Sequence, residues 1–195
     1  MSLVTKKAPE FTAKAVVPDG TFQELKLSSY HGKYVILFFY PLDFTFVCPS
    51  EIIAFDAVLP RFTDKQAEVI GVSVDSHYTH YAWRATPRDK GGIGNIGFPL
   101  VADIDKSIAR SFGVLVDEAV ALRGLFLIDK DGIVRHELIN DLSLGRNVEE
   151  ALRILDALQY TERHGEVCPA NWRQGDEAMR PTAEGVAAYL AKHAR

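Results

Sequence analysis

The hydrophobic residues of the chain form short continuous runs and stripes at helical spacing, and together these patterns predict alternating strands and helices. Residues 34–40 (YVILFFY) and 68–74 (EVIGVSV) are short apolar runs rich in β-branched and aromatic residues, which is typical of buried strands. Between them an apolar stripe recurs at helical spacing: Ile52, Phe55, Leu59 and Phe62. We therefore expect a helix that starts near Cys48, is kinked or ended at Pro60, and connects two parallel strands by a right-handed crossover.

Turn sequences and further apolar runs predict the remaining elements. Pro18-Asp19-Gly20 separates two extended segments within residues 11–27, which predicts an N-terminal hairpin, and Asp129-Lys-Asp-Gly132 is a second hairpin turn. The other expected elements are a helix within 76–90, a strand at 98–102, a helix at 103–112, strands at 121–129 and 133–140, a helix at 147–163 and a last helical segment at 186–193. This alternation predicts an α/β fold with a central mixed sheet covered by helices on both faces.

Composition and charge narrow the class of protein. The chain has 195 residues, of which 47% are hydrophobic and 25% charged, as expected of one ordinary soluble domain. Its formal net charge is −4 and its basic residues are scattered, so we expect no nucleic-acid partner. No apolar run is long enough for a membrane span or a secretory signal, so we expect no membrane partner and a cytoplasmic location.

The two cysteines, Cys48 and Cys168, are too few for a disulfide scaffold, and redox or catalytic use is the better interpretation. Cys48 is expected at the N-terminus of a helix and at the carboxyl end of a central strand, with Pro49 suited to the first helical position. Unpaired backbone N–H groups and the helix dipole favour a thiolate there. The alternative is that Cys48 is an inert small hydrophobic residue. A zinc site would need three or four ligands at short spacing, so no metal or cofactor is predicted.

One charged residue interrupts an otherwise apolar strand. Arg123 lies at the start of the run Leu122–Ile128. Because a buried guanidinium is costly without an anionic partner, we expect a carboxylate beside Arg123 rather than solvent.

Residues 41–51, PLDFTFVCPSE, resemble the active-site segment of the peroxiredoxins, with Pro41, Thr45 and Cys48 matching its motif position by position. Residues 166–172, EVCPANW, resemble the segment of the resolving cysteine in the typical two-cysteine subfamily, which includes the peroxidase subunit of alkyl hydroperoxide reductase. The resemblance extends from about residue 8 to residue 172. It implies a thioredoxin-like fold with an N-terminal hairpin, in which residues 1–165 form the peroxidase domain and residues 166–195 a C-terminal extension.

The same resemblance implies roles for individual residues. Cys48 would attack a hydroperoxide and become a sulfenic acid, while Arg123 would hold the thiolate and the developing alkoxide. The other matching positions are Pro41, which would shield the sulfur, Thr45, which would hydrogen-bond the peroxide, and Glu51 and Arg146, which would support the site from behind. For Glu51, an ordinary surface role is the alternative.

The resemblance further implies that Cys168 of the partner subunit resolves the sulfenic acid into an intersubunit disulfide. That disulfide would be recycled by thioredoxin or by a flavoprotein disulfide reductase, in a homodimer that assembles to a decamer. Members of the family that are sensitive to overoxidation carry a Gly-Gly-x-Gly loop and a C-terminal Tyr-Phe pair. This chain has the loop at residues 91–94 but Tyr189-Leu190 in place of Tyr-Phe, so we expect intermediate sensitivity.

Three other functions remain as alternatives. A thioredoxin-like disulfide exchanger usually has Cys-x-x-Cys, but the position three after Cys48 is Glu51. A cysteine hydrolase would need a histidine base, for which His31, His77 and His80 are candidates. A holdase chaperone is the third, as a second role of a ring-forming protein.

Overall fold

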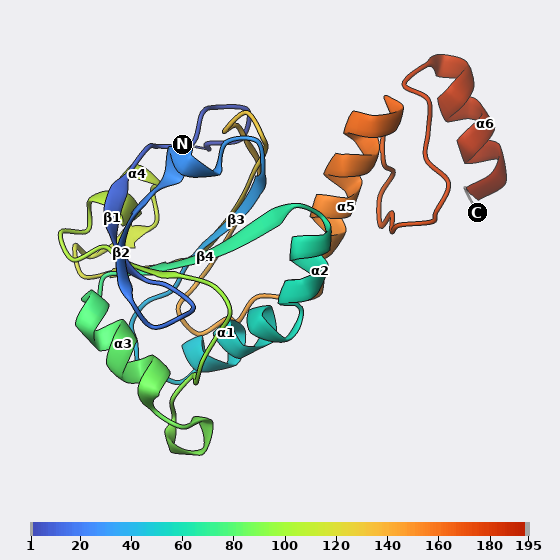
Figure 1. Cartoon of the computed structure of the whole chain (residues 1–195). Helices are drawn as coiled ribbons and strands as arrows, with labels where there is room; N and C mark the ends of the chain where they lie inside the picture. The colour runs from blue at the N-terminus through green and yellow to red at the C-terminus, as the bar shows by residue number, and fades with distance from the viewer. Residues whose placement is uncertain (1, 194–195) are drawn as a thin grey trace. The chain divides into compact units, whose positions relative to one another are not determined.

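The computed structural model describes residues 2–193, which form the alternating α/β pattern that the sequence predicts (Figure 1). The strands are β1 (Thr12–Val16), β2 (Phe22–Lys26), β3 (Tyr34–Phe39), β4 (Ala67–Ser73), β5 (Leu100–Ala102), β6 (Leu115–Val116), β7 (Val120–Ala121), β8 (Arg123–Ile128) and β9 (Val134–Asn140). The helices are α1 (Cys48–Ala57), α2 (Leu59–Asp64), α3 (His77–Ala85), α4 (Ser107–Ser111), α5 (Val148–His164) and α6 (Ala183–His193), with 3-10 turns η1 (Leu27–Tyr30) and η2 (Arg88–Lys90).

Seven of the strands form one mixed sheet in the order β2-β1-β5-β4-β3-β8-β9. β3 runs parallel to β4, and β4 parallel to β5, while the pairs β1·β2, β1·β5, β3·β8 and β8·β9 are antiparallel. The predicted N-terminal hairpin, the parallel pair and the second hairpin are therefore confirmed. Every residue of β3 is buried, which explains why its sequence is apolar without alternation.

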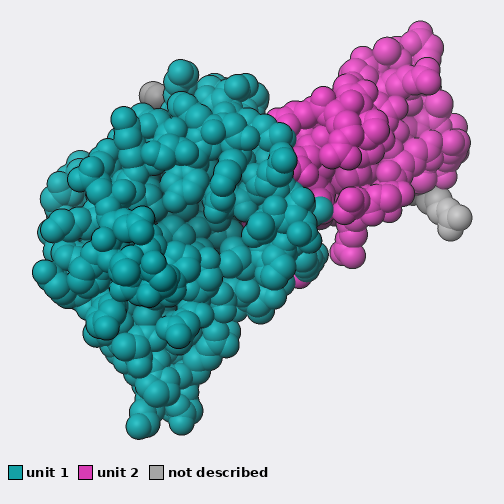
Figure 2. All heavy atoms as spheres, viewed as in Figure 1, with its two compact units in different colours: residues 1–148 teal, residues 149–195 magenta. Residues whose placement is uncertain are grey.

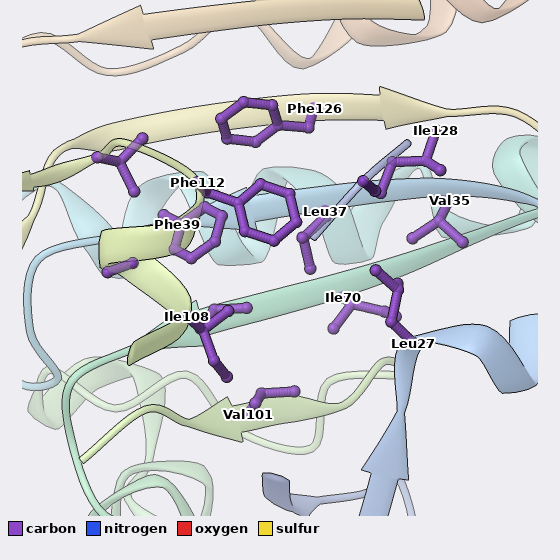
Figure 3. Close-up of a cluster of buried hydrophobic side chains, with 14 of the residues drawn as sticks. Leu27, Val35, Leu37, Phe39, Ile70, Val101, Ile108, Phe112, Phe126 and Ile128 are labelled. Atoms are coloured by element: carbon purple, nitrogen blue, oxygen red, sulfur yellow. The ribbon is translucent and has the colours of Figure 1, made fainter. Parts of the chain in front are cut away.

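The period of two along β3 supplies the two faces of the core. Val35, Leu37 and Phe39 point to one face, where they join a cluster that includes Phe112 and Phe126 (Figure 3). On the other face Phe38 stacks on Phe55 of α1, with ring centroids 4.6 Å apart and planes at 13°. Burial of a side chain of this size contributes about 1.5–3 kcal/mol. This contact fixes α1, and hence its first residue, against the central strand.

Two expected helices are shorter in the structure than in the sequence prediction. The helix expected from Cys48 to Phe62 is two helices separated at Val58, and Pro60 lies in the first turn of the second one, where it needs no N–H partner. The helix expected at 103–112 begins only at Ser107, because the carboxylate of Asp103 accepts the N–H groups of Ile108 (3.0 Å) and Ala109 (2.7 Å).

The chain divides into two compact units, residues 1–148 and 149–195, which are coloured separately in Figure 2. The second unit holds most of α5 and all of α6, which is longer than the one or two turns expected at 186–193. This division groups residues 149–165 with the C-terminal segment, whereas the sequence analysis grouped them with the peroxidase domain. The boundary at residue 165 stays a prediction. Among the helices in residues 2–193, none has the length and apolar character needed to span a membrane.

Candidate active site

Cys48 is the first residue of α1, and its side chain is fully buried. The residues between β3 and α1 carry the chain from the central strand to this position. Pro49 occupies the second helical position rather than the first, and neither position has an intrahelical partner for its N–H. The sulfur therefore lies at the positive end of a helix and out of contact with water, as the sequence predicts for its backbone setting.

Arg123 brings a positive charge to this sulfur. Its Nη1 lies 3.4 Å from Cys48 Sγ, and its Nε donates to the carbonyl of Leu142 at 2.8 Å. Arg123 opens β8, which pairs with β3 through Leu125 and Phe38, so it lies near the end of β3 from which the chain leads to Cys48. The side chain is only 3% exposed.

Glu51 is the anionic partner that the sequence predicts for Arg123. It lies three residues after Cys48 on α1, and its Oε2 accepts from Arg123 Nη1 at 2.7 Å and from Arg146 Nη2 at 2.9 Å. Its Oε1 accepts from both the backbone N and the Nε of Arg146, each at 2.8 Å. Because Glu51 is buried in this contact, an ordinary surface role for it is wrong.

Arg146 is held on its far side by the sheet itself. Its Nη1 donates to the carbonyl oxygens of Phe39 (2.8 Å) and Gly124 (2.6 Å), at the ends of the two strands that flank the site. These backbone acceptors could not be found from the sequence, because they depend on how β3 and β8 pair. These two hydrogen bonds hold the Arg146 guanidinium in one orientation. Because Glu51 binds both arginines, they also help to hold Arg123 in place.

The charges of this cluster favour an ionised Cys48. Two guanidinium groups and one carboxylate leave a formal charge of +1 beside a neutral thiol, and a thiolate brings that charge to zero. Burial raises the pKa of Glu51, but the hydrogen bonds and charge of Arg146, with the charge of Arg123, bring the net pKa below its ordinary value. Burial lowers the pKa of Arg146. Because the ordinary pKa of an arginine is very high, the side chain stays charged.

The loop between β3 and α1 carries two further predicted residues, Pro41 and Thr45. Pro41 is buried, and Thr45 is partly exposed, with its hydroxyl donating to the carbonyl of Leu42 at 2.8 Å. Phe44 between them has a φ of +53°, in the left-handed region that a residue with a side chain rarely adopts. The loop is therefore held in one strained conformation, and neighbouring contacts must maintain it.

A buried polar network that the sequence analysis missed provides those contacts. The carboxylate of Asp43 accepts from the hydroxyl of Tyr40 (2.8 Å) and lies 2.7 Å from Nδ1 of His80, whose Nε2 lies 3.1 Å from the carbonyl of Val101. Burial raises the pKa of Asp43 against the opposing effect of His80, and burial together with Asp43 raises that of Tyr40. His80 is thus engaged on both ring nitrogens, which removes it as the base of a cysteine hydrolase.

Residues on either side of the glycine loop at 91–94 are hydrogen-bonded to Asp56 of α1. The N–H of Gly97 donates to Asp56 Oδ1 at 2.8 Å, and Arg88 contacts the other oxygen of the same carboxylate at 3.2 Å. A side chain at Gly97 would clash with Leu59, since a Cβ there would lie 2.6 Å from it. The residues on either side of the loop at 91–94 therefore contact α1.

Cys168 belongs to the second unit, where it lies half-buried against α5, on the segment that follows this helix. Its Sγ is 3.7 Å from the carbonyl oxygen of Ala157 and 3.8 Å from the hydroxyl of Thr161. Both cysteines are free thiols. Across residues 2–193, no three His, Cys, Asp or Glu side chains come together in a group that could hold a metal ion.

Comparison with known proteins gives matches over nearly the whole chain. Residues 4–137 match the model of the AhpC/TSA family, and residues 157–192 match that of the C-terminal domain of 1-Cys peroxiredoxin. The chain is 55% identical to mouse peroxiredoxin-2 over 97% of its length and 96% of that protein. It is 58% identical to alkyl hydroperoxide reductase C of Helicobacter pylori J99, over 98% of both proteins.

Solved structures agree with these relatives. The reduced 2-Cys peroxiredoxin of Plasmodium vivax superposes with a TM-score of 0.97 at 55% identity, covering 98% of this chain and all of that one. AhpC of Enterococcus faecalis superposes with a TM-score of 0.81 at 38% identity, covering 87% of this chain. These structures establish the thioredoxin-like peroxiredoxin fold. The C-terminal model carries a 1-Cys label, yet here this segment contains a second cysteine, Cys168.

Proposed function

The chain belongs to the AhpC/TSA family and is a peroxidase of the peroxiredoxin type, and we propose that it reduces hydrogen peroxide and organic hydroperoxides through Cys48. The observation that carries the assignment of Cys48 is its contact with Arg123 at 3.4 Å inside a buried cluster of balanced charge. The disulfide exchanger loses support because Glu51, where a second cysteine would stand, binds both arginines.

In the first step the thiolate of Cys48 attacks the nearer oxygen of the peroxide. A sulfur–oxygen bond forms as the oxygen–oxygen bond breaks, and the departing oxygen takes a proton to leave as water or an alcohol. Cys48 becomes a sulfenic acid. Arg123 stabilises the negative charge at sulfur before the reaction and at the departing oxygen during it, because its position is fixed before substrate arrives.

The remaining predicted residues would shape this step. Thr45 uses its O–H on Leu42, which leaves the oxygen lone pairs to accept a hydrogen bond from a hydroperoxide. Pro41 is buried and has no N–H. It would therefore keep water from the sulfur without donating a hydrogen bond to the sulfur itself. Glu51 and Arg146 would act by positioning Arg123.

The sulfenic acid would be resolved by Cys168 of a second copy of the chain. The thiol of Cys168 and the sulfenic acid of Cys48 combine into a disulfide and release one water. Because Cys48 is fully buried at the start of α1, the first turn of that helix must unwind before its sulfur can be reached. A dithiol reductant, thioredoxin or a flavoprotein disulfide reductase, would then restore both thiols by exchange.

A homodimer that assembles to a decamer fits this cycle. β9 is the last strand of the sheet, and Ile139 on it is 44% exposed in the single chain, so this edge is a candidate for pairing with a second copy. A related protein, Prx1a of Plasmodium yoelii, is described as an artifactual octamer when modified at its N-terminus. The cytoplasmic location predicted from the sequence remains a proposal.

The intersubunit disulfide gives a direct test. Wild type, Cys48→Ser and Cys168→Ser are treated with one equivalent of hydrogen peroxide and run on a non-reducing gel. We expect a band at twice the chain mass in the wild type alone. A wild-type band that persists in Cys168→Ser would contradict the resolving role, and consumption of peroxide by Cys48→Ser at the wild-type rate would contradict the nucleophile.

A holdase chaperone is the alternative second role. Phe22, Tyr78 and Tyr81 form an exposed aromatic cluster, with ring centroids 5.4 Å and 5.7 Å from Phe22, and such apolar surface is what a holdase offers to unfolded chains. If the protein is such a chaperone, wild type and Cys48→Ser should protect a heat-denatured test protein from aggregation equally well.

A further inference from the structure

The thiol of Cys168 shares its nearest polar atom with a neighbouring hydroxyl. The carbonyl oxygen of Ala157 on α5 lies 3.7 Å from Cys168 Sγ and accepts from the hydroxyl of Thr161 at 2.9 Å. The Thr161 oxygen itself lies 3.8 Å from the sulfur. The sulfur of Cys168, the Ala157 carbonyl oxygen and the Thr161 hydroxyl oxygen thus form a small triangle of polar atoms.

This arrangement suits a neutral thiol and opposes a thiolate. An S–H group can donate to the Ala157 carbonyl, but a thiolate beside the same oxygen meets only lone pairs, and a hydrogen bond to the neutral form disfavours ionisation. The hydroxyl of Thr161 can correct this, because a threonine O–H rotates freely between acceptors. By turning from the Ala157 oxygen to the sulfur it becomes a donor to the thiolate.

The other polar and titratable side chains around Cys168 are already engaged. Arg153 of α5 binds both carboxylate oxygens of Glu150 (2.6 and 2.7 Å) and the carbonyl of Trp172 (2.8 Å). Tyr160 of α5 donates to Glu166, on the segment that carries Cys168, at 2.7 Å. Thr161 is therefore the side chain whose donor can reach the sulfur by rotation alone.

We infer that Thr161 is a positioning residue for the resolving step, whose hydroxyl stabilises the thiolate of Cys168. The inference rests on the proposed role of Cys168. The thiolate attacks the sulfur of the Cys48 sulfenic acid, the new sulfur–sulfur bond forms as the sulfur–oxygen bond breaks, and the hydroxide that leaves is protonated to water. When a dithiol later reduces the disulfide, Cys168 can leave as a thiolate that the same hydroxyl receives.

The test compares Thr161→Val, which has nearly the same shape but no hydroxyl, with Thr161→Ser, which keeps it. A matched control is Thr63→Val, since Thr63 makes the same contact within α2, to the Leu59 carbonyl at 3.2 Å, with no cysteine partner. In a Cys48→Ser background, alkylation of Cys168 at neutral pH should be about five-fold slower with Thr161→Val, the loss expected for one partly exposed hydrogen bond. In Thr161→Ser and Thr63→Val, Cys168 should be alkylated at the same rate as in the Cys48→Ser background.

The pH profile separates this role from a purely structural one. At strongly alkaline pH, where the thiol is fully ionised in every variant, the four rates should converge, whereas a change in access to the sulfur would persist. In the full enzyme, Thr161→Val should slow disulfide formation after peroxide by a similar factor, leave oxidation of Cys48 unchanged, and unfold at the wild-type temperature.

Two failures can be told apart. If wild type forms no disulfide through Cys168, the proposed function fails. If wild type forms the disulfide but Thr161→Val shows wild-type rates of Cys168 alkylation and of disulfide formation, the role of Thr161 is wrong and the proposed function stands. The same holds if the alkylation rate of Thr161→Val differs from that of the background by the same factor at every pH.

Discussion

Replacing Arg123 by Gln should remove the positive charge that we propose makes Cys48 reactive. With a neutral thiol the cluster of Arg123, Glu51 and Arg146 carries a formal charge of +1, and with a thiolate it carries none. In Arg123→Gln the neutral thiol leaves the cluster at zero and ionisation would create a buried negative charge. Since Glu51 keeps its contacts with Arg146, the variant should still fold.

The size of the effect follows from the 3.4 Å between Arg123 Nη1 and Cys48 Sγ. Two unit charges at this distance attract by about 5 kcal/mol at an effective dielectric constant of about 20. Glu51 lies 2.7 Å from the same nitrogen and cancels part of this, which leaves about the value of a charge-assisted hydrogen bond, 1.5–3 kcal/mol. The rate of Cys48 oxidation should therefore fall about 10- to 160-fold.

The assay is rapid-mixing fluorescence at limiting peroxide, with the thiolate of Cys48 followed separately by ultraviolet absorbance. Arg123→Lys should lie between Gln and wild type, because a lysine keeps the charge but cannot bind Leu142, Glu51 and the sulfur together. The exposed Arg110→Gln is the control and should match wild type. Equal rates and equal thiolate content in Arg123→Gln and wild type would refute the electrostatic account.

Further predictions concern Glu51, Thr45 and overoxidation. Glu51→Gln should lower the free energy of unfolding by about 3–5 kcal/mol in denaturant titrations, because it leaves two buried guanidinium groups without a carboxylate. The folded pKa of Glu51 lies below its ordinary value, so this stabilisation is complete above the unfolded pKa of about 4.3 and is lost as pH falls through the folded pKa. If the difference in free energy of unfolding between wild type and Glu51→Gln stayed constant in acid, this account would be contradicted. Thr45→Val should slow oxidation of Cys48 about ten-fold and Thr45→Ser should not, since one hydrogen bond is at stake; equal rates would remove Thr45 from the mechanism. Intact-mass measurement during turnover should show partial conversion of Cys48 to sulfinic acid as peroxide rises, and none at millimolar peroxide would count against intermediate sensitivity.

The sequence by itself determined most of the secondary structure and, through the family resemblance, led to the prediction that Cys48 is the reacting sulfur. The continuous apolar run of Tyr34–Phe39 and the helical stripe after Cys48 predict a buried strand and a helix, since other arrangements would expose those apolar residues. It also indicated that Arg123 needs an anion, because the cost of a buried guanidinium does not depend on the fold.

The family resemblance named Arg123, Glu51 and Arg146, but only the tertiary structure shows which of their atoms meet near Cys48. Glu51, Arg123 and Arg146 come from a helix, a strand and a loop up to 95 residues apart, and the pairing of β3 with β8 brings them together. The acceptors for Arg146 are backbone carbonyls of Phe39 and Gly124, which no side-chain pattern records. Local periodicity can specify an element and its buried face, whereas contacts between distant elements depend on register and packing, which are set only when the whole sheet forms.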